Sequence, residues 1–435
     1  IGSGIFIVSA DIVRQVHSPF LLLMAWAAAA IITVFGALSY GELAAMYPAA
    51  GGQYVYLKEI YGKLIAFLYG WSLFTVIQTG TIAAVAVAFA KYSGVFFDAI
   101  SDKNYLLEIG KFNISTQQLL GVVIIWVLTI YNFREVKTGA ILQNILTTIK
   151  VISLLGLILI GIIFGIMHPE VWQANWAIPA LPDNTPWLGL LTLFGAAMTG
   201  SLFSSDSWNN ITFTAGEINN PKRDLPLSLV FGTGTVTGLY LLANISYLSV
   251  LPTEAIAHAD NDRVATALMQ VIVGNWGKWL MAAMIMVSTF GCLNGCIFTA
   301  GRVYYAMAKD KLFLPQAAML NKNGVPQTAL IMQASWASLL ALSGSYGNLL
   351  NYIMFSVLLF YILTVAGVFV LRFRLPDADR PYRTFGYPLI PALYVLLTSA
   401  VCCSMLYENA EFAGYGLGLI LFGIPVFYLT KYFTK

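Results

Sequence analysis

The sequence predicts an integral membrane protein built entirely from α-helices. Three observations lead to this prediction: 59% of the 435 residues are hydrophobic, only 10% are charged, and the mean hydropathy is +0.77. A soluble domain usually carries about 25% charged residues, so this chain lacks the charge to cover a water-facing surface of its size. The same values exclude a disordered chain, which would combine low hydrophobicity with high net charge.

Apolar stretches recur along the chain at about the length of 20 residues that a helix needs to cross a bilayer. We predict twelve spans, the first of them cut short at its start, at residues 1–15, 20–47, 61–97, 116–132, 139–167, 187–217, 226–251, 276–308, 327–343, 347–373, 386–406 and 413–432. None of them shows the alternation of polar and apolar residues that is typical of a β-barrel strand.

The positions of Lys and Arg predict the orientation of these spans. Fifteen of the 23 fall in loops on one side, six fall on the other, and Lys150 and Arg302 lie within predicted spans. Because Lys and Arg are retained on the cytoplasmic side, we expect a multi-pass protein of the cell membrane with both termini in the cytoplasm. The net charge of +3 does not indicate a nucleic-acid partner.

Two predicted spans are interrupted by residues that disfavour a membrane helix. The first opens with IGSGIF at residues 1–6, and the sixth carries FSSDSWNN at residues 203–210 between two apolar halves. Unwound backbone at membrane depth survives only where it lines a cavity enclosed by protein, and paired breaks in two halves of a chain are typical of transporters with inverted repeats. The alternative is a pair of Gly or Ser packing contacts, which the acid and the two Asn of the second break make less favourable.

This interpretation divides the chain into three parts. Residues 1–168 form a first five-helix repeat, residues 187–374 form a second, and residues 385–435 hold spans eleven and twelve with the C-terminus.

Broken helices place helix ends inside the membrane, and such ends suit a zwitterion. The N–H groups of an amino-terminal end attract a carboxylate, and the carbonyls of a carboxyl-terminal end attract an ammonium. We expect the carboxylate at the N–H groups of Ser3, Gly4 and Ile5, and the ammonium at carbonyls near Ile1 and around residues 203–206. The candidate substrate-binding residues are Ile1, Gly2, Ser3, Gly4, Ile5, Phe203, Ser204, Ser205, Asp206, Trp208 and Asn209. Any α-amino acid carries both groups, so an amino acid is the expected substrate and the lipid bilayer the expected surroundings.

Two charges at membrane depth are candidates for function. Lys150 lies far from the ends of span five, where a charge usually faces a partner or a water-filled cavity; the alternative is a side chain that extends to the interface. Asp206 is either a counter-charge for an amine in the pocket or the cap of the second half of span six. Glu42, Glu217 and Arg302 lie near the cytoplasmic ends of their spans and are candidates for a gate, with surface ion pairs as the alternative.

Signatures of enzymes, metal sites and disulfides do not occur in the sequence. His17, His168 and His258 are far apart in predicted loops, and the chain has no Walker-type loop, H-E-x-x-H or G-x-S-x-G. Its four cysteines lie in apolar stretches and predict no disulfide framework. We therefore expect no enzymatic activity, no metal and no cofactor, and transport driven by gradients or by exchange.

Four motifs in order along the chain resemble those of a known family. They are GSGIF at residues 2–6, LSYGEL at 38–43 with GGQYVY at 51–56, WNNITF at 208–213 with EINNP at 217–221 and DLPL at 224–227, and FGCLNG at 290–295 followed by FTA at 298–300 and Arg302. Together they resemble the amino acid-polyamine-organocation superfamily and, within it, the L-type amino acid transporters. The resemblance runs over essentially the whole chain and implies the LeuT-like fold of five plus five helices with two more appended.

The resemblance implies an exchanger of amino acids with roles for particular residues. Phe203 matches the aromatic residue that closes over the substrate, and Lys150 matches the lysine whose ammonium takes the place of sodium, so transport without sodium is expected. An Asp at position 206 resembles members that accept cationic as well as neutral amino acids.

The resemblance also bears on partners. Light subunits of the family carry a cysteine after span three for linkage to a heavy chain, whereas residues 98–115 contain none. This resembles the bacterial members, so no disulfide-linked heavy-chain partner is expected; the sequence indicates no oligomeric state.

The expected mechanism is alternating access, in which spans one, two, six and seven rock against the rest. Two alternatives remain open: a symporter driven by protons, and a membrane sensor that binds amino acids without transporting them.

Overall fold

The computed structural model describes residues 2–109, 112–134, 136–181, 186–343, 346–408 and 410–433. Helices dominate this part of the chain, as the sequence predicts, and Ile1 lies outside it.

The first half of the chain contains helices of very different lengths and one hairpin. Its elements are η1 (Gly4–Phe6), α1 (Val8–Val16), α2 (Pro19–Met46), α3 (Gln53–Tyr61), α4 (Lys63–Ser72), the π-helical η2 (Leu73–Ile77), α5 (Gln78–Ser93), β1 (Tyr105–Ile109), β2 (Phe112–Ser115), α6 (Thr116–Tyr131), α7 (Val136–Met167) and α8 (Pro169–Trp176). The two strands pair antiparallel.

The second half is built in the same way. Its elements are α9 (Trp187–Ser205), η3 (Trp208–Glu217), α10 (Pro221–Val250), α11 (Thr253–Ala257), η4 (Asp260–Asp262), α12 (Val264–Val273), α13 (Asn275–Lys309), η5 (Pro315–Ala318), α14 (Gln327–Ser343), α15 (Tyr346–Arg374), α16 (Leu389–Glu408) and α17 (Ala410–Phe433).

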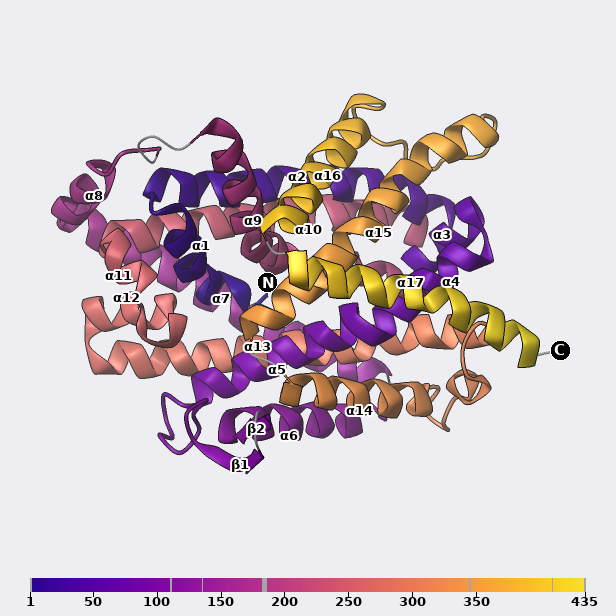
Figure 1. The fold of residues 1–435 in the computed structure, drawn as a ribbon, viewed down its shortest axis with the longest axis horizontal. Helices are drawn as coiled ribbons and strands as arrows, with labels where there is room; N and C mark the ends of the chain where they lie inside the picture. The colour runs from indigo at the N-terminus through magenta and orange to yellow at the C-terminus, as the bar shows by residue number, and fades with distance from the viewer. Residues whose placement is uncertain are drawn as a thin grey trace.

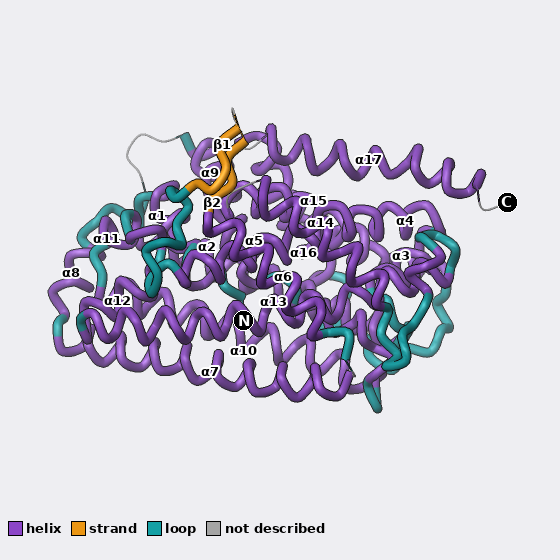
Figure 2. The backbone as a smooth tube through the Cα atoms, turned by 90° about the horizontal axis from the view of Figure 1, so that it is seen from below, coloured by secondary structure: helices purple, strands orange, loops and turns teal. Residues whose placement is uncertain are grey.

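The long helices run roughly along the longest axis of the molecule (Figure 1). Helices α8, α11 and α12 lie at one end of this axis and α3 at the other, an arrangement that the second view repeats (Figure 2). We call these the α12 end and the α3 end. Along the bundle α2 packs against α10, α9 and α16, and α13 packs against α5 and α7.

Seven helices within the described residues are long and apolar enough to cross a membrane. They are Pro19–Met46, Lys63–Ser93, Gln143–Met167, Pro221–Val250, Asn275–Lys309, Ile353–Arg374 and Leu389–Glu408. Each of the twelve predicted ranges contains a helix, so the prediction of a helical multi-pass membrane protein is confirmed at this coarser level.

The sequence did not predict α3, α8, α11, α12 or the hairpin. These elements are short and lie between the long apolar stretches, so a search for runs of 20 apolar residues passes over them.

Both predicted interruptions are present in the backbone. Before α1, the 3-10 turn η1 is followed by Ile7, whose φ of −128° and ψ of −52° are not helical. Helix α9 ends at Ser205; Asp206 is extended and Ser207 is left-handed at φ 64°. Ser and Asp favour such breaks because their side chains compete for backbone hydrogen bonds.

Candidate functional site

The two breaks meet near the centre of the molecule, where both views place the start of the chain (Figures 1 and 2). A Cβ atom on Gly4 would overlap the Ser204 side chain and lie 3.1 Å from the Ser204 Cα atom. One on Gly2 would lie 3.0 Å from the Ser204 carbonyl oxygen. Only glycine lets the two backbones approach this closely.

Tyr240 of α10 joins the two breaks. Its hydroxyl accepts a hydrogen bond from the Gly2 N–H at 2.8 Å and donates one to the Ser204 carbonyl at 3.0 Å. Its ring packs edge-on against Trp26 of α2. Sequence reasoning missed this residue because a tyrosine inside an apolar stretch gives no signal of its role.

Two further tyrosines bind carbonyls of the first break. Tyr247 donates to the Ile5 carbonyl at 3.1 Å, and Tyr92 donates to the Phe6 carbonyl at 3.0 Å. The non-helical carbonyls are thus satisfied by side chains from other helices, as backbone at membrane depth requires.

The N–H groups predicted to bind a carboxylate lie at the start of η1. Helix geometry gives the first N–H groups, here those of Gly4 and Ile5, no acceptor within the helix. The neighbouring Gly2 N–H is already bound to Tyr240. The hydroxyls of Ser204 and Ser205 are also committed, to the carbonyls of Gly200 and Ser201.

Asp206 binds across the bundle. Its Oδ1 atom accepts a hydrogen bond of 2.7 Å from the Tyr361 hydroxyl of α15. The cap residue of η3 is Ser207, which makes no side-chain capping bond. The Asp206 carboxylate also receives a hydrogen bond from the Ser207 backbone, so it contacts both the bundle interior and the start of the next segment. Both the counter-charge and the cap therefore stay predictions.

Asn209 and Trp208 follow the break and line the same region. Asn209 donates to Gln53 Oε1 at 3.0 Å and lies 3.1 Å from the Tyr361 hydroxyl. Trp208 packs against Tyr40 and Tyr361, with ring centroids 4.8 and 5.4 Å apart. The other aromatic residue, Phe203, is buried near the end of α9.

A small cavity lies beside Asp206, and its free space matches about one water molecule. Its walls come from α3, α4, the π-helical η2, α5, the second break with η3, and α15; they include Gln53, Gln78, Asn210 and Tyr361. A π-helical turn is frequently found at a functional site. The described residues contain no group of three or more His, Cys, Asp or Glu side chains that could hold a metal ion.

Lys150 of α7 is buried, with 4% of its surface exposed. A Cβ atom on Gly291 of α13 would lie 3.1 Å from its Cε atom, and the sulfurs of Cys292 and Cys296 are its electrostatic neighbours. The side chain therefore points into the bundle, not toward the interface. That its ammonium faces the carbonyls of the first break stays a prediction.

A charged network closes the α3 end. Glu42 is buried and accepts two hydrogen bonds from Arg372, at 3.0 and 2.7 Å. It also lies 3.2 Å from Arg380 and accepts the Thr384 N–H at 2.7 Å. These contacts join α2 to α15 and to the loop that follows α15, which is what a gate requires.

The other two gate candidates, Glu217 and Arg302, are paired with each other at 3.0 Å. Arg302 also donates to the Phe298 carbonyl and lies over the Phe298 ring, 3.9 Å from its centroid. This pair joins η3 to α13, separately from Glu42.

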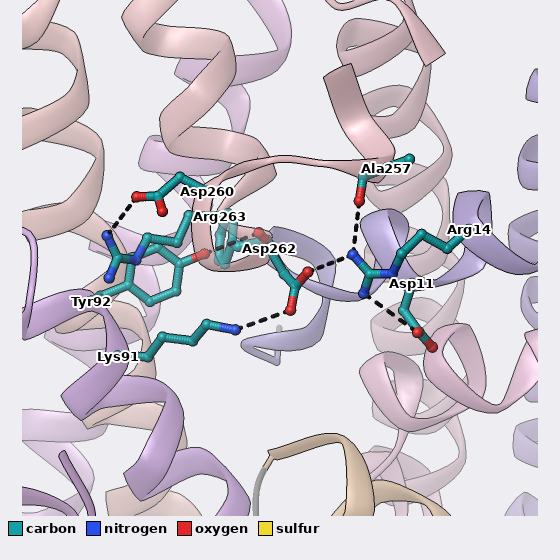
Figure 3. A network of polar contacts seen from close by, with 9 residues as sticks. Asp11, Arg14, Lys91, Tyr92, Ala257, Asp260, Asp262 and Arg263 are labelled. Carbon is teal, nitrogen blue, oxygen red and sulfur yellow. Dashed lines mark hydrogen bonds and ion pairs between the residues drawn. The ribbon is translucent and has the colours of Figure 1, made fainter. Parts of the chain in front are cut away.

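A second network lies at the α12 end (Figure 3). Asp262 binds Arg14 at 2.7 Å and Lys91 at 3.2 Å, so it joins α1 to α5 through η4. Arg14 also donates to the Ala257 carbonyl at 2.8 Å. Arg14 and Lys91 are two of the six basic residues that the sequence places on the non-cytoplasmic side, and the sequence gives no sign of their common partner.

The α12 network is expected to weaken in acid. Burial raises the pKa of Asp262, but the charges of Lys91 and Arg14 outweigh it and hold the pKa below its usual value. Because the pKa of Asp262 is lowered, its ionised carboxylate stabilises the folded, closed form at every pH above the ordinary Asp pKa of about 3.9. This stabilisation is lost as the pH falls through the lowered pKa of the folded protein. A cysteine placed behind the network should therefore become more accessible below about pH 4, measured as its rate of modification relative to that of free cysteine at the same pH.

Asp262→Asn should give the same reactivity at neutral pH. Asp11→Asn is the matched control, because its contact to Arg14 is 3.5 Å long and 59% of its side chain is exposed. Equal reactivity in both variants would show that Asp262 does not hold this end closed.

Comparison with known proteins identifies relatives over the full length. A family described as amino acid permease matches residues 1–424. The mouse protein named large neutral amino acids transporter small subunit 2 is 31% identical over 440 residues, which cover 99% of this chain and 78% of the relative; the human protein of that name is 31% identical over 435 residues, with the same shares. The mouse b(0,+)-type amino acid transporter 1 is 29% identical over 446 residues, covering 100% and 85%.

These relatives correct one expectation. The absence of a cysteine from residues 98–115 led us to expect no disulfide-linked heavy-chain partner. Similar proteins are named small subunits, and a small subunit is by its name one part of an assembly. The expectation was wrong because it rested on one short segment, whereas the relatives resemble the chain over 99% of its length.

The resemblance seen in the motifs is thus confirmed by a match that begins at the first break and continues into α17. The chain belongs to the amino acid permease family.

Proposed function

We propose that the protein exchanges neutral and cationic L-amino acids across a cell membrane, without sodium, by alternating access. The observation that carries the proposal is the pair of broken helices that Tyr240 holds together at the centre of the bundle, with charged contacts at both ends. The names of the relatives, which refer to large neutral amino acids and to a b(0,+)-type amino acid transporter, support amino acids as substrates.

The substrate would lie between the two breaks. Its carboxylate would bind the N–H groups of Ser3, Gly4 and Ile5, and its ammonium would bind carbonyls near Ile1 and Ser204. The close approach of Gly4 to Ser204 supports this placement, since it brings the amino-terminal start of η1 beside the carboxyl-terminal end of α9. Phe203 would close over the substrate, and Asp206 would accept a cationic side chain.

The architecture proposed for this mechanism has twelve membrane helices. Residues 1–168 and 187–374 form two inverted repeats of five helices, each led by a broken helix, and residues 385–435 add two more. Both termini lie in the cytoplasm, which the excess of Lys and Arg in the loops of the α3 end supports.

The end networks fit the rocking of spans one, two, six and seven against the rest. Glu42 on span two binds Arg372 on span ten, and Glu217 on span six binds Arg302 on span eight. At the α12 end Arg14 on span one is linked through Asp262 to Lys91 on span three. Each network therefore joins the moving spans to the others, and opening one end requires breaking only the network at that end.

Lys150 would supply the positive charge that a bound sodium ion supplies in other transporters. Its burial in α7 beside α13 supports this role. A charge at that depth is energetically costly, so charged residues found there mostly serve a function.

Exchange across liposomes tests this proposal. Protein reconstituted without sodium should take up labelled alanine far faster when the vesicles contain unlabelled alanine than when they are empty. Equal uptake into empty vesicles driven by an imposed pH gradient would make the protein a symporter, and binding without uptake would make it a sensor. Either result would overturn the proposal.

A further inference from the structure

A chain of hydrogen bonds leads from α15 through α3 to the second break. Thr364 lies 2.7 Å from the Phe360 carbonyl oxygen, which can only accept, so the Thr364 hydroxyl donates to it. The Thr364 oxygen must then accept from Gln53 Nε2, at 2.9 Å. This sets the orientation of the Gln53 amide, whose Oε1 accepts from Asn209 Nδ2 at 3.0 Å.

The direction of this chain leaves two acceptors beside one hydroxyl. With its Nδ2 directed at Gln53, Asn209 turns its Oδ1 toward the Tyr361 hydroxyl, 3.1 Å away. The same hydroxyl lies 2.7 Å from Asp206 Oδ1. Tyr361 has one proton and cannot donate to both oxygens. All contacts are satisfied if Asp206 is protonated and donates to Tyr361, which then donates to Asn209.

Reversing both amides gives a second arrangement. Thr364 then turns from Phe360 and donates to Gln53, Gln53 donates to Asn209, and Asn209 donates to the Tyr361 oxygen. The Tyr361 proton is directed at Asp206, which is ionised. The network thus has two states that differ by one proton on Asp206, and the contact between Thr364 and Phe360 belongs to the protonated state.

Among the residues that the structure describes, no Lys, Arg or His forms an ion pair with Asp206. The titratable groups that interact with it are Tyr361 of α15, Tyr69 of α4, Tyr394 of α16, and Cys292 and Cys296 of α13. Lys150 interacts with the two cysteines. An ionised carboxylate in such a place is costly unless a cation accompanies it.

We propose that Asp206 carries a proton whenever the site holds a neutral amino acid and releases it when the site holds a cationic one. Exchange of a cationic for a neutral amino acid would then move one proton across the membrane in the direction opposite to the cationic substrate. The charge of the occupied site is then the same in both cases. This inference rests on the proposed exchange function and adds a proton movement to it.

The charges and atoms balance over one cycle. A cationic amino acid displaces the Asp206 proton to water on the side to which the site is open, and the site crosses with one positive and one negative charge. A neutral amino acid returns with the proton taken up by Asp206 from water on the other side. The small cavity beside Asp206 offers space for the water that accepts or supplies this proton.

The test uses the reconstituted full chain with alanine and a pH-sensitive dye inside the vesicles. Arginine added outside should enter, and the interior should become alkaline by about one proton per arginine, with no response of the rate to membrane voltage. Alanine outside should exchange without a pH change. Arginine entry that leaves the internal pH unchanged and follows the voltage would overturn the inference, as would failure to take up arginine at all.

These failures differ from failure of the exchange function, in which alanine against alanine would not exchange either. In Asp206→Asn, the alkalinisation should vanish and arginine uptake should fall more than tenfold, with a smaller loss for alanine. Glu170→Gln, an exposed acid on α8, is the control and should keep both signals. Equal losses for arginine and alanine in Asp206→Asn would contradict the inference.

The pH dependence gives a readout that a loss of folding would not produce. Arginine uptake should fall as the external pH falls, because protonation of Asp206 opposes a second positive charge, while alanine uptake should not. Tyr361→Phe removes one of the two donors to the ionised carboxylate and leaves the Ser207 backbone as the other, so the fall should occur at higher pH. Identical pH profiles for arginine and alanine in the wild-type protein would overturn the inference.

Discussion

Replacing Glu42 with glutamine is expected to open the α3 end. The change removes the negative charge that Arg372 and Arg380 share, and it leaves their guanidinium groups, on side chains that are 22% and 6% exposed, without a counter-charge. Removing one partner of a buried ion pair costs about 3–5 kcal/mol, which is more than a hundredfold in the balance between closed and open forms. The rate at which a thiol reagent reacts with a cysteine placed behind the network should rise accordingly, and exchange should become slow.

Glu217→Gln provides the matched control for this variant. It removes the same charge from the same end of the molecule, but 38% of the Glu217 side chain is exposed against 2% for Glu42. Water therefore screens the Glu217 carboxylate more strongly, and we expect a smaller opening although its partner Arg302 is only 7% exposed. If Glu217→Gln opened the α3 end as much as Glu42→Gln, the burial of Glu42 would not be the reason that this end is closed.

Gly4→Ala is expected to abolish exchange through a single added methyl group. The new Cβ atom would lie 2.9 Å from Ser204 Cβ and 3.1 Å from Ser204 Cα, so the first break must move away from the second. Overpacking of this kind costs about 1–3 kcal/mol, and the move displaces the N–H groups that bind the carboxylate. We expect initial rates of alanine exchange to fall at least about tenfold.

Two further variants separate this effect from the general cost of losing a glycine. Gly156→Ala on α7 places a methyl group where no atom lies within 4 Å and should exchange at the wild-type rate. Ser204→Gly combined with Gly4→Ala removes the Ser204 side chain and should restore part of the rate. Exchange by Gly4→Ala at the rate of Gly156→Ala would show that the breaks need not touch.

The fold and the breaks could be predicted because both follow from local chemistry. A run of apolar residues predicts a helix wherever it occurs, and the Gly, Ser and Asp residues of the two breaks disfavour a helix by themselves. Asp206 and Lys150 were found because charges are rare at membrane depth. The short α3 was missed although it carries Gln53, since its function depends on contacts with distant helices.

The partners of the site residues could not be predicted from the sequence. Tyr240 and Tyr361 are two of the 23 tyrosines in the sequence. Only the fold distinguishes them, because it places hydrogen-bond partners beside their hydroxyl groups. Arg372 and Arg380 count toward the orientation of the chain, and the structure adds that both bind Glu42, 330 or more positions earlier. Such pairs are made by packing, and no local pattern marks them.

A structure determined with a bound amino acid tests the central claim most directly. We expect the carboxylate within hydrogen-bonding distance of the N–H groups of Gly4 and Ile5, and the ammonium beside the Ser204 carbonyl, with Tyr240 still joining the two breaks. An amino acid bound anywhere else, such as the polar pocket formed at the α12 end by Asp98, Arg263 and Lys278, would contradict it.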